Sequence, residues 1–229
     1  MKKLLLFDID GTLLRSEGAT FKSITQTFQE LFGVKDTINI LSLIGATDCG
    51  IFKDAAKKLL GRQLSGKEMK AVQKRYLELL PEDLVAARFE LKPGVAKLLE
   101  MLSSRKDIIL GLETGNLEAG AFLKLKRGDI DKYFTVGGFG SDSENRTDLI
   151  RKAIERANKL NGRPIKPENI FVIGDAPHDI RAGREAGAIT IAVGTGLLTK
   201  EEVMAAKPDY FLEDLSDIPV FLKLIGCEK

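Results

Sequence analysis

The sequence has few of the residues that build disulfide-linked or zinc-bound frameworks. It contains two cysteines, one histidine and no tryptophan in 229 residues. Cys49 and Cys227 lie far apart and form no C-x-x-C pair, and His178 has no second histidine to join it. We therefore predict neither a disulfide framework nor a zinc site. Two isolated thiols suit a reducing compartment.

The sequence also lacks an excess of one charge and any long apolar run. The net charge is +2 and the basic residues are scattered, so we expect no nucleic acid partner and no membrane partner. The apolar run at residues 4–7 is too short for a signal peptide, and Asp8 ends it. We expect a cytoplasmic protein. The sequence does not distinguish a monomer from a homodimer.

Apolar runs and amphipathic stretches alternate from residue 108 onward. The expected strands are 108–112, 133–136, 169–173, 188–193 and 210–212, and the expected helices are 118–126, 147–159, 178–185, 201–206 and 217–225. This alternation predicts a parallel sheet with helices on both faces. Residues 15–90 differ, because three apolar stripes with helical spacing, starting at Phe21, Phe52 and Met69, follow one another without a strand. They predict a separate helical module.

The amino terminus carries the first chemical motif. The run 4–7 ends in Asp8-Ile9-Asp10-Gly11-Thr12, which is typical of a buried strand that delivers carboxylates to the edge of a sheet. Two clustered carboxylates are costly unless a cation or a shared proton relieves them. Three further polar segments are 113–116, 142–146 and 174–179. Three of the four segments follow predicted strands, so we expect them to meet at one rim.

D-x-D-G-T at 8–12 and G-D-x-x-x-D at 174–179 occur in this order, with the helical module between them. In these motifs the chain resembles the haloacid dehalogenase superfamily, in particular its phosphoglycolate phosphatase-like members. The resemblance implies an α/β fold, a Rossmann-like parallel sheet core with an inserted α-helical cap. Residues 1–14 and 91–229 would form the core and 15–90 the cap. The implied activity is Mg²⁺-dependent hydrolysis of a small phosphorylated metabolite.

The resemblance also implies roles for the carboxylates. Asp8 would be the nucleophile that forms an aspartyl-phosphate, and Asp10 would protonate the leaving oxygen and then activate water. Asp8, Asp175 and the main-chain carbonyl of Asp10 would bind Mg²⁺, which favours oxygen ligands. Asp179 would lie just outside, holding a metal-bound water or the basic residue of the third motif. The competing interpretations are solvated acids in a turn for the first pair and a helix cap for Asp175.

Two further motifs depart from the family pattern. Thr114 and the Gly115 amide would bind the phosphate, but the family more often has Asn directly after Ser or Thr. Asn116 therefore comes one residue late, and a helix-capping role competes. Arg146 stands where the family has a lysine. It begins a predicted helix, where the helix dipole disfavours a cation, yet arginine binds phosphate bidentately. The alternative is a solvated arginine beside Asp148.

The helical module has its own candidate contacts. Gly45, Thr47 and Asp48 resemble the cap loop that reaches over the site, although Thr47 or Asp48 as the N-cap of a helix is an equal alternative. Linkers near 14–18 and 88–92 would act as hinges. Two other functions stay open. A sugar phosphomutase of the β-phosphoglucomutase type would use the same aspartate pair. A non-catalytic phospho-acceptor or binding module would not need Asp10.

Overall fold

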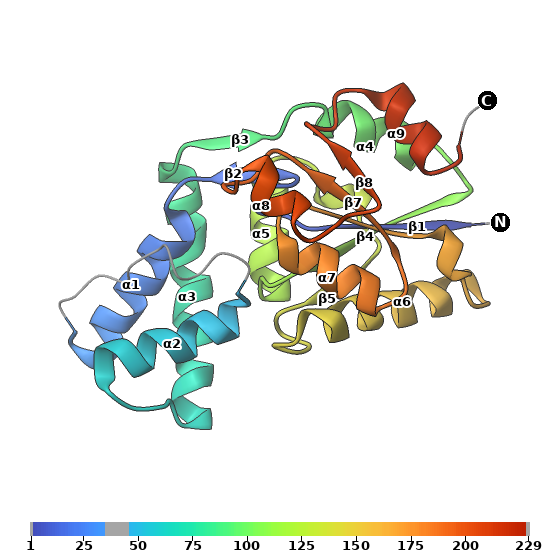
Figure 1. Cartoon of the computed structure of the whole chain (residues 1–229). Coiled ribbons are helices and arrows are strands. Elements are labelled where there is room, and N and C mark those ends of the chain that lie inside the picture. Colours follow the sequence, from blue (N-terminus) through green and yellow to red (C-terminus); the bar gives the residue numbers. More distant parts are fainter. Residues whose placement is uncertain (1, 35–45, 228–229) are drawn as a thin grey trace.

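The computed structural model describes residues 2–34 and 46–227. Its centre is a six-stranded sheet in the order β5-β4-β1-β6-β7-β8, and every neighbouring pair of strands is parallel (Figure 1). The strands are β1 (Lys3–Phe7), β4 (Ile108–Thr114), β5 (Val136–Phe139), β6 (Ile170–Gly174), β7 (Ile189–Val193) and β8 (Tyr210–Leu212). The parallel sheet confirms the predicted α/β fold class.

Helices cover both faces of this sheet, which explains the continuous apolar run of β1. Leu5 and Phe7 pack into one core layer, which also includes side chains of α4 (Val95–Ser103), α5 (Glu118–Arg127) and α9 (Ile218–Leu224). Leu4 and Leu6 face the opposite layer, formed with α6 (Arg146–Asn161) and α7 (Pro177–Glu185). The short helix α8 (Lys200–Met204) packs beside α7 through Val203. None of the described helices is long and apolar enough to cross a membrane.

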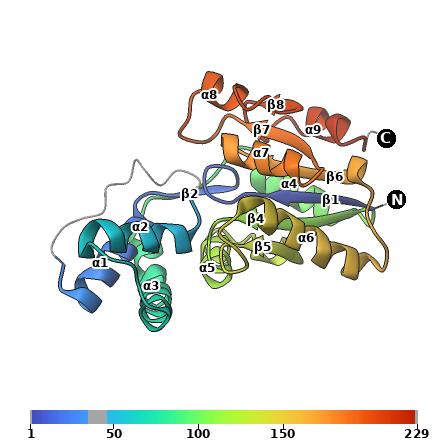
Figure 2. The same cartoon turned by 60° about the horizontal axis from the view of Figure 1, so that its bottom comes forward.

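Three helices lie beyond the carboxyl ends of the strands (Figures 1 and 2). They are α1 (Ala19–Phe32), α2 (Asp48–Leu60) and α3 (Gly66–Ala86). Each of these three helices contains one of the predicted apolar stripes. Phe28, Phe52 and Tyr76 belong to a core that these helices share. Leu117, at the start of α5, is also part of this core. The helices therefore pack around side chains of their own, and α5 and the loop before it connect this core to the sheet domain.

A short two-stranded ribbon carries the chain between the helices and the sheet. β2 (Leu14–Ser16) pairs antiparallel with β3 (Phe89–Leu91), so that the outgoing and returning chains run side by side. The sequence had suggested hinge linkers near 14–18 and 88–92, without any strand pairing between them. The predicted domain boundaries at 14/15 and 90/91 fall inside this ribbon, and the division into core and cap stays a prediction.

One predicted strand was misplaced. Residues 133–136 were expected to be extended, but Asp131–Tyr133 forms a 3₁₀ turn (η2) and the strand β5 begins only at Val136. β5 reads Val-Gly-Gly-Phe, so it lacks the apolar pattern of a strand. Glycine is required at position 138 for a steric reason, because a side chain there would overlap the main chain of Leu149 in α6. A second 3₁₀ turn (η3, Pro167–Asn169) precedes β6.

Candidate active site

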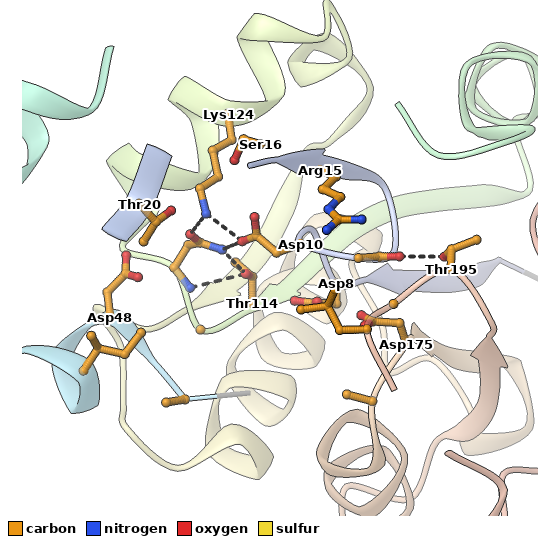
Figure 3. A pocket seen from close by; sticks show the side chains of 18 of the residues that line it. Asp8, Asp10, Arg15, Ser16, Thr20, Asp48, Thr114, Lys124, Asp175 and Thr195 are labelled. Carbon is orange, nitrogen blue, oxygen red and sulfur yellow. Dashed lines mark hydrogen bonds and ion pairs between the residues drawn. The ribbon is translucent and has the colours of Figure 1, made fainter. Parts of the chain in front are cut away.

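The predicted chemical segments meet in one pocket. Its volume is about 480 Å³, and it lies at the carboxyl ends of β1, β4 and β6, facing the helices α1 and α2 (Figure 3). Asp8, Asp10 and Asp175 line it from the sheet side, and Phe21 and Asp48 from the helical side. The expectation that the segments converge at one rim is therefore met by the geometry.

Asp8 occupies the end of the central strand. Its amide donates to the Ile173 carbonyl of β6 (2.9 Å), which fixes the main chain at this point. Its carboxylate is buried, and Oδ1 lies 2.9 Å from Nη2 of Arg146. Burial raises the pKa of Asp8 to about 6, and Arg146 opposes this rise while Asp179 and Asp10 add to it. The Asp8 carboxyl therefore lies between a cation that favours its ionised form and neighbouring acids that oppose it.

Arg146 is the first residue of α6 and points into the site. Its Nε lies 2.8 Å from Oδ1 of Asp179 and 3.3 Å from Oε2 of Glu113. Burial would lower the pKa of Arg146, but the surrounding carboxylates raise it well above its usual value. The alternative of a solvated surface arginine beside Asp148 is wrong, because the Arg146 side chain is 10% exposed. Its unusual position at a helix start is explained by these carboxylates.

Asp8, Glu113 and Asp179 each contact this guanidinium, and Asp175 is a fourth buried carboxylate of the same cluster. Oxygens of Asp8, Asp175 and Asp179 lie within 4.8 Å of one another. Burial, followed by the charges of Asp179 and Asp8, raises the pKa of Asp175 well above its usual range. One arginine does not compensate four carboxylates. A hard divalent cation with oxygen ligands fits both the donor set and the missing charge.

Asp175 is held tightly by the turns around it. Thr12 Oγ1 donates to Asp175 Oδ1 (3.0 Å). Gly11 has a φ of +92°, and a Cβ there would lie 2.5 Å from Asp175 Oδ2. A Cβ at Gly196 would overlap the same carboxylate. Thr195 Oγ1 in turn donates to the Gly11 carbonyl (2.6 Å). The turn at 194–196 therefore supports the proposed metal ligand.

Asp10 belongs to a second polar cluster, which the sequence did not reveal. Its Oδ2 accepts hydrogen bonds from Nδ2 of Asn116 (2.8 Å) and Nζ of Lys124 (2.6 Å). Lys124 Nζ also donates to Asn116 Oδ1 (2.6 Å). Figure 3 shows Lys124 and Asp10 directed toward each other. Asn116 does not cap α5, because the N-cap residue is Leu117 and it makes no side-chain cap bond.

Thr114 and Gly115 occupy the end of β4. Thr114 Oγ1 accepts a hydrogen bond from Asn116 Nδ2 (2.8 Å), which leaves its own proton for another acceptor. The Gly115 carbonyl accepts from the Asp48 amide (2.8 Å), and a Cβ at Gly115 would lie 2.6 Å from the Ala46 carbonyl oxygen. The glycine that interrupts the family pattern thus lets the helical segment lie directly on this loop.

The three predicted cap contacts have different outcomes. Thr47 is the N-cap of α2, with Oγ1 accepting from the Gly50 amide (3.1 Å), as the alternative had it. Asp48 lines the pocket, is 3% exposed and accepts from the Leu117 amide (2.8 Å). Burial raises the pKa of Asp48 to about 6. Gly45 lies outside the described residues.

Two further ionisable residues, Glu113 and His178, lie beside this cluster. Glu113 precedes Thr114 in β4, so the alternation of strand side chains sends it to the Arg146 side. Burial raises the pKa of Glu113 well above its usual range. His178 lines the pocket with Nε2 3.5 Å from Asp179 Oδ1. Burial, with Arg146 nearby, lowers the pKa of His178 to about 4, so this imidazole is neutral at physiological pH.

Fold and site together define an α/β protein with a polar pocket at the carboxyl ends of its central strands, lined by the aspartate that ends β1. A family model described as haloacid dehalogenase-like hydrolase matches residues 5–193, and the chain belongs to this family. It is 28% identical to the pyrophosphatase PpaX of Listeria monocytogenes over 93% of both chains.

Two solved structures share the fold. CbbY from Rhodobacter sphaeroides, in complex with phosphate, has a TM-score of 0.76 at 20% identity and covers 95% of this chain and 96% of its own. A predicted phosphoglycolate phosphatase from Haemophilus somnus has a TM-score of 0.73 at 22% identity, with 96% and 97% covered. At these identities the likeness concerns the fold.

Proposed function

We propose that this hydrolase is a Mg²⁺-dependent phosphatase that acts on a small organic phosphate monoester through an aspartyl-phosphate on Asp8. The observation that carries the proposal is that two aspartates of one pocket lie in different environments. Asp8 is buried against Arg146 and the acidic cluster, whereas Asp10 is 44% exposed and held by Lys124. Phosphoryl transfer to a carboxylate needs one ionised nucleophile and one separate proton donor.

The metal would be held by Asp8, Asp175 and the main-chain carbonyl of Asp10, with Asp179 just beyond them. Their oxygen donors and their excess of negative charge support Mg²⁺. When bound, the ion would supply positive charge to the phosphate oxygens. Thr114, the Gly115 amide and Arg146 would bind the remaining phosphate oxygens.

The proton transfers would fall to Asp10. The Asp8 carboxylate forms a bond to phosphorus while the bond from phosphorus to the ester oxygen breaks, and Asp10 gives its proton to that oxygen. Asp10 then takes a proton from a water molecule as this water attacks the aspartyl-phosphate. The products are the alcohol, inorganic phosphate and free Asp8.

The pocket supports an organic substrate. Its volume of about 480 Å³ exceeds what a phosphate group alone would fill, and Phe21, Ile51 and Leu197 give it apolar walls. We propose that residues 15–90 act as a cap, with the ribbon of β2 and β3 as the hinge. Closure of such a cap would exclude water during the chemistry.

We also propose a cytoplasmic location and a free metabolite as the partner. Two free cysteines, Cys49 and Cys227, support the location, and the small net charge supports a small-molecule partner. A membrane or nucleic acid partner is not part of the proposal. Monomer and homodimer are equally compatible with it.

The test is phosphate release from a panel of sugar phosphates, phosphoglycolate and pyrophosphate, with Mg²⁺ and with EDTA. We expect Mg²⁺-dependent release from one class of monoester, no turnover in Asp8→Asn, and a roughly 10²- to 10⁴-fold loss in Asp10→Asn. Asp54→Asn, an exposed residue on α2, is the matched control and should retain activity.

Other outcomes would identify the alternatives. Transfer of phosphate to a second hydroxyl of the sugar, without free phosphate, would identify a mutase. A long-lived phospho-Asp8 that is indifferent to Asp10→Asn would identify a phospho-acceptor module. Release that depends neither on Asp8 nor on metal would contradict the proposal.

A further inference from the structure

Lys124 is an unusual residue for the inside of a protein. It lies on α5, and its side chain is 2% exposed, whereas Lys126 on the same helix is exposed. Burying an ammonium group costs several kcal/mol unless it is paired, and a pair of this kind is weak evidence for a stabilising role. An apolar side chain would fill the same space at a lower cost. The buried charge therefore calls for a functional explanation.

The Lys124 ammonium group is directed at the pocket side of the site. Nζ lies 2.6 Å from Asp10 Oδ2 and 2.6 Å from Asn116 Oδ1 (Figure 3). Asn116 Nδ2 donates to the same Oδ2 of Asp10 (2.8 Å). Two donors thus converge on one oxygen of Asp10, and Oδ1 of the half-exposed carboxyl is left for the substrate. The three side chains form a closed triangle of hydrogen bonds.

We infer that Lys124 and Asn116 are positioning residues that hold the Asp10 carboxyl in the orientation for proton transfer to the leaving oxygen. This inference rests on the proposed phosphatase function. A proton donor must lie within hydrogen-bond reach of its acceptor, and Asp10 sits in an exposed turn where its side chain would otherwise rotate freely. Fixing it in advance removes this loss of rotamer freedom from the barrier.

Asn116 also links the proton donor to the phosphate-binding loop. Its Nδ2 donates to Thr114 Oγ1 (2.8 Å) as well as to Asp10. A shift of Asp10 would therefore also displace the Thr114 hydroxyl, which is proposed to bind phosphate. Lys124 makes no such contact with Thr114, and the ion pairs that orient Asp8 come from Arg146 on another helix. Substitution of Lys124 should affect proton donation more than phosphate binding.

The experiment compares two leaving groups. The p-nitrophenolate ion leaves readily without a proton, whereas an alkoxide does not. We would measure kcat/KM for p-nitrophenyl phosphate and for the best alkyl ester, at saturating Mg²⁺, in wild type, Lys124→Met and Asn116→Ser. Lys126→Met is the matched control from the same helix. Thermal unfolding checks that each variant is folded.

We expect Lys124→Met to lower kcat/KM roughly 100-fold for the alkyl ester and roughly tenfold or less for the p-nitrophenyl ester, as a misplaced proton donor would. Asn116→Ser should show the same difference between esters, which keeps the inference testable if Lys124→Met does not fold. In an Asp10→Asn background, Lys124→Met should have little further effect, because it acts through Asp10.

Two results would overturn the inference. Equal losses for both esters in Lys124→Met and Asn116→Ser would leave the phosphatase proposal intact but give these residues a structural role. If Lys124→Met and Asp10→Asn together lose the product of their separate losses in kcat/KM, Lys124 does not act through Asp10 and its role is likewise structural. A wild-type protein that hydrolyses neither ester would instead overturn the proposed function itself.

Discussion

Replacement of Asp48 by asparagine should stabilise the protein at neutral pH and not at acidic pH. Asp48 is buried at the start of α2, where its carboxylate accepts a hydrogen bond from the Leu117 amide. Burial raises the pKa of Asp48 from 3.8 to about 6, although the nearby charge of Lys124 opposes the rise. An asparagine carbonyl accepts the same hydrogen bond without carrying a charge.

The size of the effect follows from the pKa of Asp48. Between pH 3.8 and about 6 the folded protein holds this proton more tightly than the unfolded chain does. The contribution of Asp48 to stability is therefore greatest below pH 3.8 and falls as the pH rises to about 6. A difference of about two pH units at about 1.4 kcal/mol each gives an upper limit of about 3 kcal/mol.

The assay is urea unfolding of wild type, Asp48→Asn and the exposed control Asp54→Asn at several values between about pH 4 and pH 8. The free energy of unfolding of Asp48→Asn relative to wild type should rise by roughly 2–3 kcal/mol across this range. The control should show no comparable rise. If the difference in unfolding free energy between Asp48→Asn and wild type stays constant or falls with pH, ionised Asp48 does not destabilise the fold and the reasoning is refuted.

Three further perturbations test other parts of the site. Arg146→Met leaves buried carboxylates without their cation, so unfolding in EDTA should show a loss of roughly 3–5 kcal/mol, and Arg146→Lys a smaller one. Gly115→Ala pushes a Cβ against the Ala46 carbonyl, and calorimetry should show a loss of roughly 1–3 kcal/mol together with a raised KM. Mg²⁺ at about 100 times its Kd should stabilise the wild type by about 2.7 kcal/mol in a thermal shift assay, and Asp175→Asn should lose this gain. An unchanged Arg146→Met, a neutral Gly115→Ala or a metal effect that survives Asp175→Asn would each contradict the corresponding contact.

The sequence predicted those elements whose signal is local. β1 was recognisable because a strand buried on both faces is apolar throughout, and the long helices α1 and α6 because their apolar stripes span several turns. β5 was misplaced because two of its four residues are glycines, and Gly138 is required by the close main chain of α6, which a strand pattern does not reveal. The ribbon of β2 and β3 was missed because each strand has three residues.

The site was predictable where a residue belongs to a motif and not where a contact alone defines it. Asp8, Asp175 and Asp179 lie together, as the convergence of parallel strands at one rim requires. Their catalytic and metal-binding roles stay predictions. Lys124 was missed, because in the run Lys-Leu-Lys-Arg near the end of a helix it is indistinguishable from a solvated neighbour. The sequence suggested Asn116 as a helix cap. Its hydrogen bond to Asp10 appears only in the structure.

The pairing of the strands also sets the order in which the molecule can assemble during synthesis. β1 is synthesised before both of its partners, so Leu4 pairs only once Ile109 of β4 and Ile170 of β6 have been made. Helices α1 to α3 emerge in between, and the contacts of their shared core span fewer residues than the pairings of β1 with β4 and β6. Such local contacts form early and distant pairings late. Until β4 and β6 are made, the Leu-Leu-Leu-Phe strand has neither of its neighbours in the sheet, and unpaired apolar strands favour aggregation.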